Sequence, residues 1–509
     1  MHLLRWTAIG ALGLAGACAV GPSTRITTAG VPVDIRPVDT SMSRVSRVLL
    51  DSLIQARVID RPGAGAVAPA AKRQTASPEL WEPVALTLDG ARDVAWLEVL
   101  RDAQLVALVN DAVANNKDLR VAQARIREYR AQAGVARSGF FPQITANAGA
   151  SRNKAALGPT VLHYNAVRAT GDLSWELDFW GRIRRGAEAS RFDLRAREED
   201  ARATTISLVS GVATAYLQLR ELDEDVRITE ETLASRRATL DLARRRYRQG
   251  VTSELDVRLF EAELADPAAR LAELAQLRTQ AETQLSQLLG RAPGSIPRGR
   301  PLEEIVQSVT VPDSIPASFI SRRPDVLAAQ RSHQAALARI GQAVAARLPT
   351  IATGVQYGVQ HDELTNLFRR QNDIYALQVG VSVPVFDGAR LQNQERVARA
   401  RADQARSQYE QTVLTALQES ADALSGVRFG RDQLAARATQ VQALRSAFGI
   451  AEQRYRSGVS SYLEVLDAQR QLFGAQLGLV QTERQYLVST VDLYRALGGD
   501  WPVERIRKR

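Results

Sequence analysis

Apolar residues recur at helical spacing over two long stretches of the chain. No proline interrupts the sequence between about Ile183 and Arg248. Its apolar residues there lie on alternating four- and three-residue steps, the seam of a coiled coil: Leu208, Val212, Ala215, Leu219, Leu222, Val226, Leu233 and Leu240. A second stretch repeats the pattern, with residues spaced by seven at Leu434, Val441, Phe448 and Tyr455. Each helix would be about 100 Å long, so we expect these helices to pack on one another as a tube or rod.

Four shorter segments change to the two-residue period of a β-strand. In residues 167–179 one face carries only apolar or small side chains: Val167, Ala169, Gly171, Leu173, Trp175, Leu177 and Phe179. Residues 144–150, 351–360 and 377–385 alternate in the same way. Segments of about ten residues with this alternation are typical of outer-membrane β-barrel strands, although half-buried strands of soluble sheets use it too.

The chain contains two copies of one plan. Asp118-Leu-Arg-Val-Ala-Gln123 recurs as Asp325-Val-Leu-Ala-Ala-Gln330 at a shift of 207, and the segment 246–253 recurs as 454–461 at a shift of 208. Each copy runs helix, strand pair, very long helix, helix. We therefore predict an ancient duplication, with repeat 1 at residues 93–290, a Pro- and Gly-rich linker at 291–316, repeat 2 at 317–498 and a basic tail at 499–509.

Turn and breaker residues divide each long hairpin. Gly250 and Gly458 follow the two long helices, where a left-handed residue is favoured, and helices return from about Leu255 and Leu463. Pro267 stands inside the first return helix. Because proline lacks an amide hydrogen, we expect it to kink or interrupt that helix.

The N-terminus has the pattern of an export signal. One arginine and a short apolar run lead to Leu14-Ala-Gly-Ala17, and the only cysteine of the chain, Cys18, follows directly. The segment resembles a bacterial lipoprotein signal, with Ala15 where such signals usually have leucine. We therefore predict a signal peptide at residues 1–17, acylation of Cys18, and a lipidated tether at 18–92. A buried structural cysteine is the alternative, but its surroundings lack helix or strand periodicity.

Composition excludes several classes of protein. With 45% hydrophobic residues the chain is not disordered as a whole, and after residue 20 no apolar run approaches the ~20 residues of a membrane-spanning helix. A single cysteine and four scattered histidines argue against disulfide scaffolds and metal sites. The 66 basic residues exceed the 56 acidic ones, but the arginines alternate with acids as on solvated helix faces. We expect no nucleic-acid partner and no enzyme activity, since phosphate-binding loops and nucleophile elbows are absent from the sequence.

Four strands are too few for a barrel, because the smallest known barrels have eight. Open sheet edges do not occur in lipid. A barrel built from this chain would therefore need strands from several copies, and we predict an oligomer. His163 and His361 would then lie in the two turns outside the membrane, where we expect solvated loops rather than a metal site.

Three segments together resemble a known family. They are Cys18-Ala-Val-Gly-Pro22, the run from Trp96 to Leu119, and Tyr455-Arg-Ser-Gly-Val-Ser-Ser-Tyr-Leu-Glu-Val-Leu-Asp-Ala-Gln469. The chain resembles the TolC-like outer-membrane efflux proteins, in their lipoprotein (NodT-type) branch, over residues 92–498. The resemblance implies a mainly α fold with a membrane β-barrel. Three chains would form a twelve-stranded barrel in the outer membrane, continued by a twelve-helix α-barrel in the periplasm.

The resemblance also implies partners and a passive role. Small molecules such as drugs or toxic compounds would leave through the duct after delivery by an inner-membrane pump, of the resistance-nodulation-division class, through a periplasmic adaptor (membrane fusion) protein. No cofactor is expected besides the lipid on Cys18. The alternative is a lipid-anchored periplasmic coiled-coil scaffold or adaptor without a pore. Adaptors, however, have one hairpin flanked by compact β domains, whereas this chain has two duplicated hairpins.

Residue roles are carried over from the family by position. Gly250, Val251, Gly458 and Val459 correspond to the periplasmic tips that contact the adaptor. The periplasmic gate would comprise Tyr455, Glu464, Asp467 and Asp256. Since the acids at 464 and 467 share a helix face, three chains would form a ring of six carboxylates that favours cations. For each acid the alternative is a solvated carboxylate at a helix end.

Overall fold

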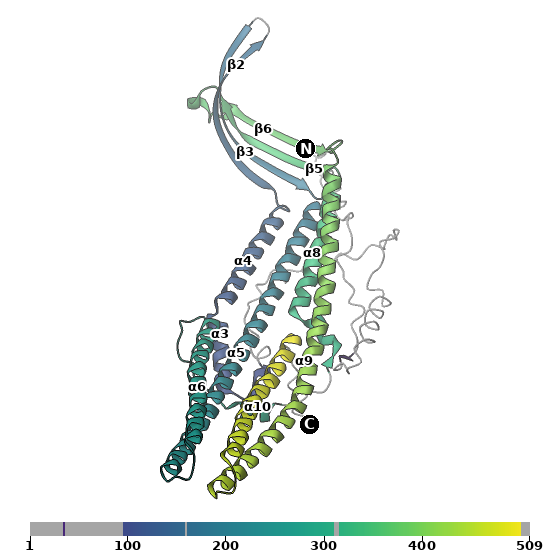
Figure 1. The fold of residues 1–509 in the computed structure, drawn as a ribbon. Helices are drawn as coiled ribbons and strands as arrows, with labels where there is room; N and C mark the ends of the chain where they lie inside the picture. Colours follow the sequence, from purple (N-terminus) through teal and green to yellow (C-terminus); the bar gives the residue numbers. More distant parts are fainter. Residues whose placement is uncertain (1–33, 36–94, 158–159, 310–314, 500–509) are drawn as a thin grey trace. The chain divides into compact units, whose positions relative to one another are not determined.

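The computed structural model describes residues 34–35, 95–157, 160–309 and 315–499 (Figure 1). The predictions for the signal peptide and for Cys18 lie outside these residues, as do those for most of the tether and of the tail. The described chain divides into two units. The first contains residues 124–199 and 327–411. The second contains the described residues within 27–123, 200–326 and 412–509.

The order of elements confirms the predicted duplication. The first repeat contains η2 (Ala95–Leu100), α3 (Ala103–Asn115), α4 (Lys117–Ser138), β2 (Gln143–Leu157), β3 (Thr160–Leu177), α5 (Arg182–Arg248) and α6 (Glu254–Leu288). The linker holds α7 (Leu302–Ser308) and β4 (Ile315–Pro316), which pairs with β1 (Asp34–Ile35). The second repeat contains η3 (Ala317–Arg322), α8 (Pro324–Ala345), β5 (Thr350–His361), η4 (Leu364–Asn366), η5 (Arg370–Asn372), β6 (Asp373–Ser382), α9 (Arg390–Arg456) and α10 (Tyr462–Ala496). The long helices α5 and α9 each have 67 residues, and α6 and α10 each have 35. Among the described helices, none is both long enough and apolar enough to cross a membrane.

In the first unit the four strands form one antiparallel sheet in the order β2-β3-β5-β6. A row of cross-strand partners, one from each strand, is apolar: Ile144, Leu173, Val355 and Leu377. The two at the sheet edges are 74% and 73% exposed. The opposite face is polar around Asp172, which accepts hydrogen bonds from Asn147, Thr170 and Gln356. The sheet therefore presents one exposed apolar face, as the alternation predicts.

Two details of the strand prediction are wrong. The strands end at Leu177 and Ser382, before the alternation itself stops at 179 and 385. His163 lies within β3 opposite Lys154 rather than in a turn, and His361 is the last residue of β5. Alternation continues into these segments although hydrogen-bonded pairing does not, because an extended backbone keeps the two-residue period without a partner strand.

The helix segments of the first unit follow the order of the strands. Arg197 of α5 lies 5.1 Å from the ring centre of Tyr129 on α4. An ion pair between Asp193 and Arg339 joins α5 to α8. The seam between α8 and α9 is apolar and contains Ala336, Ile340 and Ala402. The order α4-α5-α8-α9 thus repeats the order β2-β3-β5-β6.

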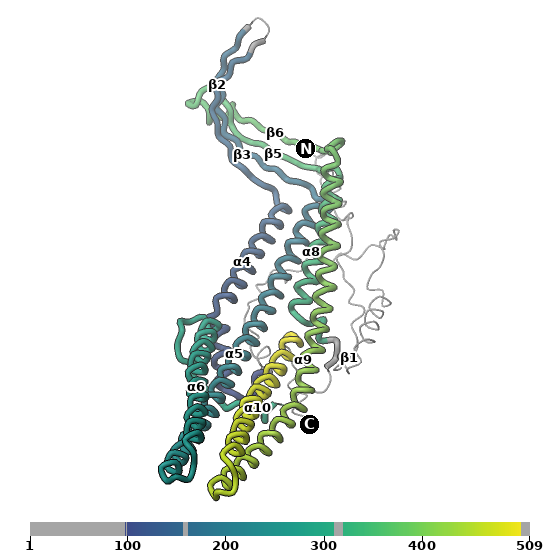
Figure 2. The backbone as a smooth tube through the Cα atoms, viewed as in Figure 1, coloured from purple at the N-terminus to yellow at the C-terminus, as the bar shows by residue number. Residues whose placement is uncertain are grey.

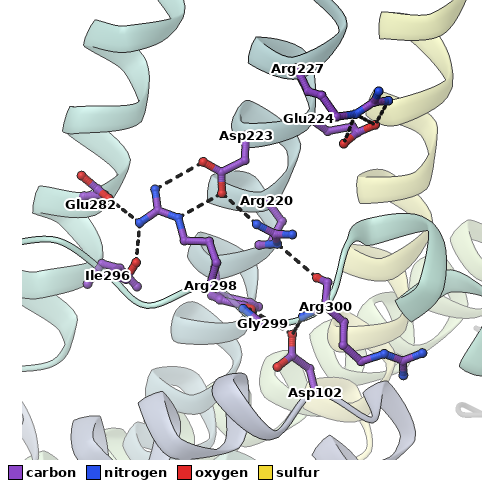
Figure 3. Close-up of polar contacts among 11 residues, drawn as sticks. Asp102, Arg220, Asp223, Glu224, Arg227, Glu282, Ile296, Arg298, Gly299 and Arg300 are labelled. Carbon is purple, nitrogen blue, oxygen red and sulfur yellow. Dashed lines mark hydrogen bonds and ion pairs between the residues drawn. The ribbon is translucent and has the colours of Figure 1, made fainter.

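In the second unit a buried carboxylate ties the linker to the helices (Figure 3). Asp102 accepts hydrogen bonds from the amides of Gln104 and Leu105 at the start of α3, from the Tyr216 hydroxyl at 2.8 Å and from the Arg300 amide at 3.2 Å. The same hydroxyl accepts a hydrogen bond from the Gly299 amide at 2.8 Å. A buried carboxylate is stable only when its oxygens are satisfied, and here three separate segments satisfy them.

The return helices end on equivalent contacts in the two repeats. Asn116 donates from Nδ2 to the carbonyl oxygen of Leu288 at 2.9 Å, and Arg323 donates from Nη1 to that of Ala496 at 3.0 Å. The donors are 207 positions apart and the acceptors 208, as in the sequence repeat. The duplication therefore preserves the place of this contact while the donor side chain differs.

Pro267 does not interrupt its helix, so that part of the prediction is wrong. α6 runs unbroken from residue 254 to 288. Proline offers no amide to the carbonyl of Glu263, four residues earlier. The buried Arg236 of α5 donates from Nη1 to this carbonyl and also pairs with the Glu263 carboxylate at 3.1 Å. A side chain from the neighbouring helix thus replaces the missing backbone donor.

Candidate functional site

Both long hairpins turn through the same backbone motif. The amides of Gly250 and Val251 donate to the carbonyls of Tyr247 and Arg246, each at 2.9 Å. Gly250 has a φ of 73° and its equivalent Gly458 one of 78°, which is the left-handed region that favours glycine. Val251 and its equivalent Val459 are each 69% exposed. The four predicted tip residues thus lie at two matching turns, with an apolar side chain projecting from each.

An apolar cluster joins the two hairpins just behind these turns. The first hairpin contributes four side chains, Leu240, Ala243, Val257 and Phe260, and the second contributes Ala451, Tyr455, Tyr462 and Val465. The ring centres of Phe260 and Tyr462 are 3.6 Å apart, and Tyr455 meets Tyr462 edge-on at 6.4 Å. The two tips are therefore packed on each other within a single chain.

Tyr455 is buried in this cluster beneath an arginine that our sequence reasoning did not single out. The guanidinium of Arg246 lies 4.6 Å from the centre of the Tyr455 ring. It also donates to the carbonyl oxygens of Tyr455 and Arg456, at 3.3 and 3.2 Å. A cation is favourable at the carboxyl end of a helix, so Arg246 of α5 stabilises the end of α9. The only signal in the sequence was its place in the repeated motif.

The three predicted acids have different surroundings. Glu464 is half exposed, and its carboxylate lies 3.8 Å from Nε of Arg454. Asp467, also exposed, accepts a hydrogen bond from Gln471 at 2.6 Å. The two lie three residues apart on α10, on one helix face as predicted. Neither carboxylate is buried, so both can interact with ions in the surrounding water.

Asp256 is held by the start of its own helix. Its carboxylate accepts hydrogen bonds from the Thr252 hydroxyl at 2.6 Å and from the Ser253 hydroxyl and amide at 2.9 and 3.2 Å. Together with Ser253 it forms a capping box. Hydrogen bonds from Thr252 and then Ser253 hold the pKa of this carboxyl below its usual range. The acid therefore has a structural role at the N-terminus of α6.

Two buried acids on the helices of the second unit escaped the sequence analysis. Asp225 on α5 is 9% exposed; burial, and then the nearby charge of Glu221, raises its pKa to about 7. Burial, and then Glu303, likewise raises the pKa of Glu483 on α10 to about 7. Hydrophobic periodicity could not reveal them, because acids on amphipathic helices normally lie on the solvated face.

Comparison with known proteins identifies the family. The sequence profile described as outer membrane efflux protein matches residues 108–291 and 315–499. The chain belongs to the outer membrane efflux protein family. The two matched segments correspond to the two copies found in the sequence, and this family consists of transport channels rather than enzymes.

Relatives cover most of the chain. The probable efflux pump outer membrane protein TtgC of Pseudomonas putida is 32% identical over 418 residues, 81% of this chain and 86% of its own. The cation efflux system protein CusC of Escherichia coli O6:H1 is 31% identical over 419 residues, 81% and 90% of the two chains. The protein is therefore an outer-membrane efflux channel, as the sequence predicts.

Solved structures agree on the fold. The outer-membrane channel OprN superposes with a TM-score of 0.78 at 28% identity, covering 95% of this chain and all of that one. The outer membrane protein VceC of Vibrio cholerae gives 0.74 at 26% identity, covering 80% and 99%. The combination of a β-barrel with a helical barrel, predicted from the sequence, is thus the architecture to which this chain contributes.

Proposed function

We propose that three copies of this chain assemble into one continuous duct. The observation that carries the proposal is the sheet of the first unit, which has an exposed apolar face and two edge strands, β2 and β6, each paired on one side only within the described residues. Such edges do not occur in lipid. Pairing β6 of one copy with β2 of the next satisfies them, and three copies give twelve strands.

The proposed assembly is tested by its size and by its dependence on detergent. The protein is extracted from isolated outer membranes with detergent, and its mass is measured by light scattering corrected for bound detergent. We expect three chains per particle. A monomer released without detergent would instead support a periplasmic scaffold or adaptor that lacks a pore.

We infer that the duct accepts small molecules from an inner-membrane pump of the resistance-nodulation-division class through a periplasmic adaptor. The exposed Val251 and Val459, held on rigid glycine turns, offer the adaptor two small apolar contacts per chain. The names of the relatives mention a toluene efflux pump and a cation efflux system. Deleting the gene should sensitise cells to such compounds, and a Val251→Asp, Val459→Asp variant should fail to restore resistance while still assembling in the membrane.

The gate proposal assigns ion selectivity to Glu464 and Asp467. In a trimer their six exposed carboxylates would attract cations at the narrow end of the duct. In planar bilayers, the Glu464→Gln, Asp467→Asn variant should lose most of its preference for cations, measured from the reversal potential in a salt gradient. Glu273→Gln, which removes an exposed acid paired with Arg270 farther along α6, is the matched control. An unchanged reversal potential in the double variant would exclude these acids from the gate.

The lipid anchor on Cys18 is proposed from the sequence alone. Mass spectrometry of the mature N-terminal peptide should find an acylated Cys18, and a Cys18→Ser variant should remain unprocessed. A mature chain that begins elsewhere would remove the anchor but would leave the duct proposal intact.

A further inference from the structure

One strand hairpin extends beyond the four-stranded sheet. Pairing of β3 with β5 begins at Val167 and His361, whereas pairing of β2 with β3 continues to Leu157 and Thr160. Residues 151–157 and 160–166 therefore form a two-stranded extension, which we call the hairpin extension (Figure 2). It lies at the end of the strands opposite to the end that adjoins α4, α5, α8 and α9 of the same unit.

The hairpin extension is basic. Between Ser151 and Ala166 the sequence contains no aspartate or glutamate, but it contains Arg152, Lys154 and His163. Lys154 lies opposite His163 in the register, and Arg152 lies two residues before Lys154 on the same strand. Residues two apart on a strand and directly opposite across it share a face. All three side chains are exposed, and none forms an ion pair with another residue that the structure describes.

This basic face continues the apolar face of the sheet. Ile144, Ala146, Ala148 and Ala150 precede Arg152 at two-residue steps on β2, and all point to the side that carries Leu173 and Val167 on β3. The surface therefore changes from apolar to basic where the sheet narrows to two strands. If the apolar face contacts lipid, as the proposed function requires, the basic residues lie at the level of the headgroups.

The other hairpin of the same sheet lacks this charge. Between β5 and β6, Arg369 and Arg370 are balanced by two acids, Asp362 and Glu363, and a third acid, Asp373, begins β6. His361 lies 2.7 Å from the Asp362 carboxylate. The positive charge is thus confined to one hairpin in each chain, and the two hairpins provide a natural comparison.

We propose that the basic face of the hairpin extension binds phosphate groups of anionic lipid headgroups in the outer leaflet of the membrane. The inference rests on the proposed membrane assembly and adds a lipid contact to it. Lysine and arginine near an anionic lipid surface each contribute a favourable electrostatic interaction that is screened by salt. The apolar face of the sheet would contact the acyl chains of a lipid. The adjoining basic face of the hairpin extension would contact its phosphates.

The experiment measures binding of bisphosphorylated lipid A to the purified full-length protein in nonionic detergent, by native mass spectrometry. The Arg152→Ser, Lys154→Ser variant should bind roughly thirtyfold more weakly, from the usual contribution of two basic residues. The matched control, Arg369→Ser, Arg370→Ser, removes the same charge from the other hairpin and should bind as the parent does. Monophosphorylated lipid A should bind the parent more weakly than the bisphosphorylated form.

Conductance of the same samples in planar bilayers separates the two proposals. The lipid contact would be overturned if the Arg152/Lys154 variant bound lipid A as tightly as the parent, or if the control variant lost as much binding as that variant. In either case a conducting pore would still support the duct. A protein that forms no pore would contradict the proposed function itself.

Discussion

The unbroken helix around Pro267 leads to a quantitative prediction about Arg236. The guanidinium donates to the Glu263 carbonyl that the proline leaves without an amide partner. The arginine is almost fully buried, pairs with Glu263, and also lies 3.5 Å from the Asp266 carboxylate. In the second repeat the equivalent positions hold Leu444 and Ala475, which pack in an apolar cluster with Val441 and Leu472. Arginine is therefore present in the repeat that contains the proline.

The size of the effect follows from the contacts. Replacing Arg236 by methionine keeps the apolar volume but removes a charged hydrogen bond of about 1.5–3 kcal/mol and leaves a buried carbonyl unsatisfied. The Asp266 carboxylate is exposed, so its pairing adds little. We expect a loss of about 2–3 kcal/mol in the free energy of unfolding. In a Pro267→Ala background, where the substituted residue supplies a backbone amide, the same change should cost about 1–2 kcal/mol less.

The assay is a double-mutant cycle, with urea unfolding in detergent followed by the helical circular dichroism signal. Ala475→Pro is the control for an uncompensated proline, and it should cost about 3 kcal/mol or more because no arginine lies opposite. The reasoning is refuted if the coupling between Arg236→Met and Pro267→Ala is below about 0.5 kcal/mol. It is equally refuted if Ala475→Pro is tolerated.

Three further predictions concern stability. Burial raises the pKa of Asp225 and of Glu483 to about 7, so the folded state binds more protons than the unfolded state between about pH 4 and 7 and stability falls as the pH rises through that range. The Asp225→Asn variant should therefore be more stable than the parent at pH 8, by up to about 4 kcal/mol at about 1.4 kcal/mol for each unit of the pKa rise, and nearly equal to it at pH 4; urea titrations at the two pH values measure this difference. Tyr216→Phe removes the hydroxyl that bridges Asp102 and Gly299 and should cost about 1–3 kcal/mol, seen as a lower urea midpoint; an unchanged midpoint would mean that the bridge contributes nothing. Gly250→Ala should cost about 1–2 kcal/mol because its φ is left-handed, whereas Gly474→Ala, in α10 with open space around the added methyl group, should stabilise by about 0.5–1 kcal/mol; equal effects would show that backbone conformation does not decide the outcome.

Much of the fold follows from the period of the sequence. The first long helix, expected from about Ile183 to Arg248, extends from Arg182 to Arg248, because a coiled-coil seam without proline allows only one regular structure. The alternating segments form strands because a two-residue period places the apolar side chains on one face only in an extended backbone. Periodicity reports which face of an element is apolar, and in this chain that information is enough to order helix, strand pair, long helix and helix.

Contacts between distant side chains could not be predicted in this way. The Arg246 guanidinium contacts Tyr455, which is 209 residues away in the chain. The Tyr216 hydroxyl accepts a hydrogen bond from the amide of Gly299 in the linker. Both depend on which helices become neighbours, and a one-dimensional pattern does not contain that information. The same limit explains why the break expected at Pro267 is absent from the structure. The donor that replaces the missing backbone amide comes from another helix.

The duplication itself favours the second repeat as the place of the proposed selectivity acids. Asp256 and Glu464 occupy the same position, three residues after the cap residue of the return helix. In the first repeat the carboxylate is held by Thr252 and Ser253, whereas Ser461 makes no side-chain capping bond. The longer Glu464 side chain leaves the backbone and lies 3.8 Å from Arg454 instead. A carboxylate engaged in capping is fixed and directs its oxygens to its donors, whereas the second-repeat acid remains exposed, as the proposed attraction of a passing cation requires.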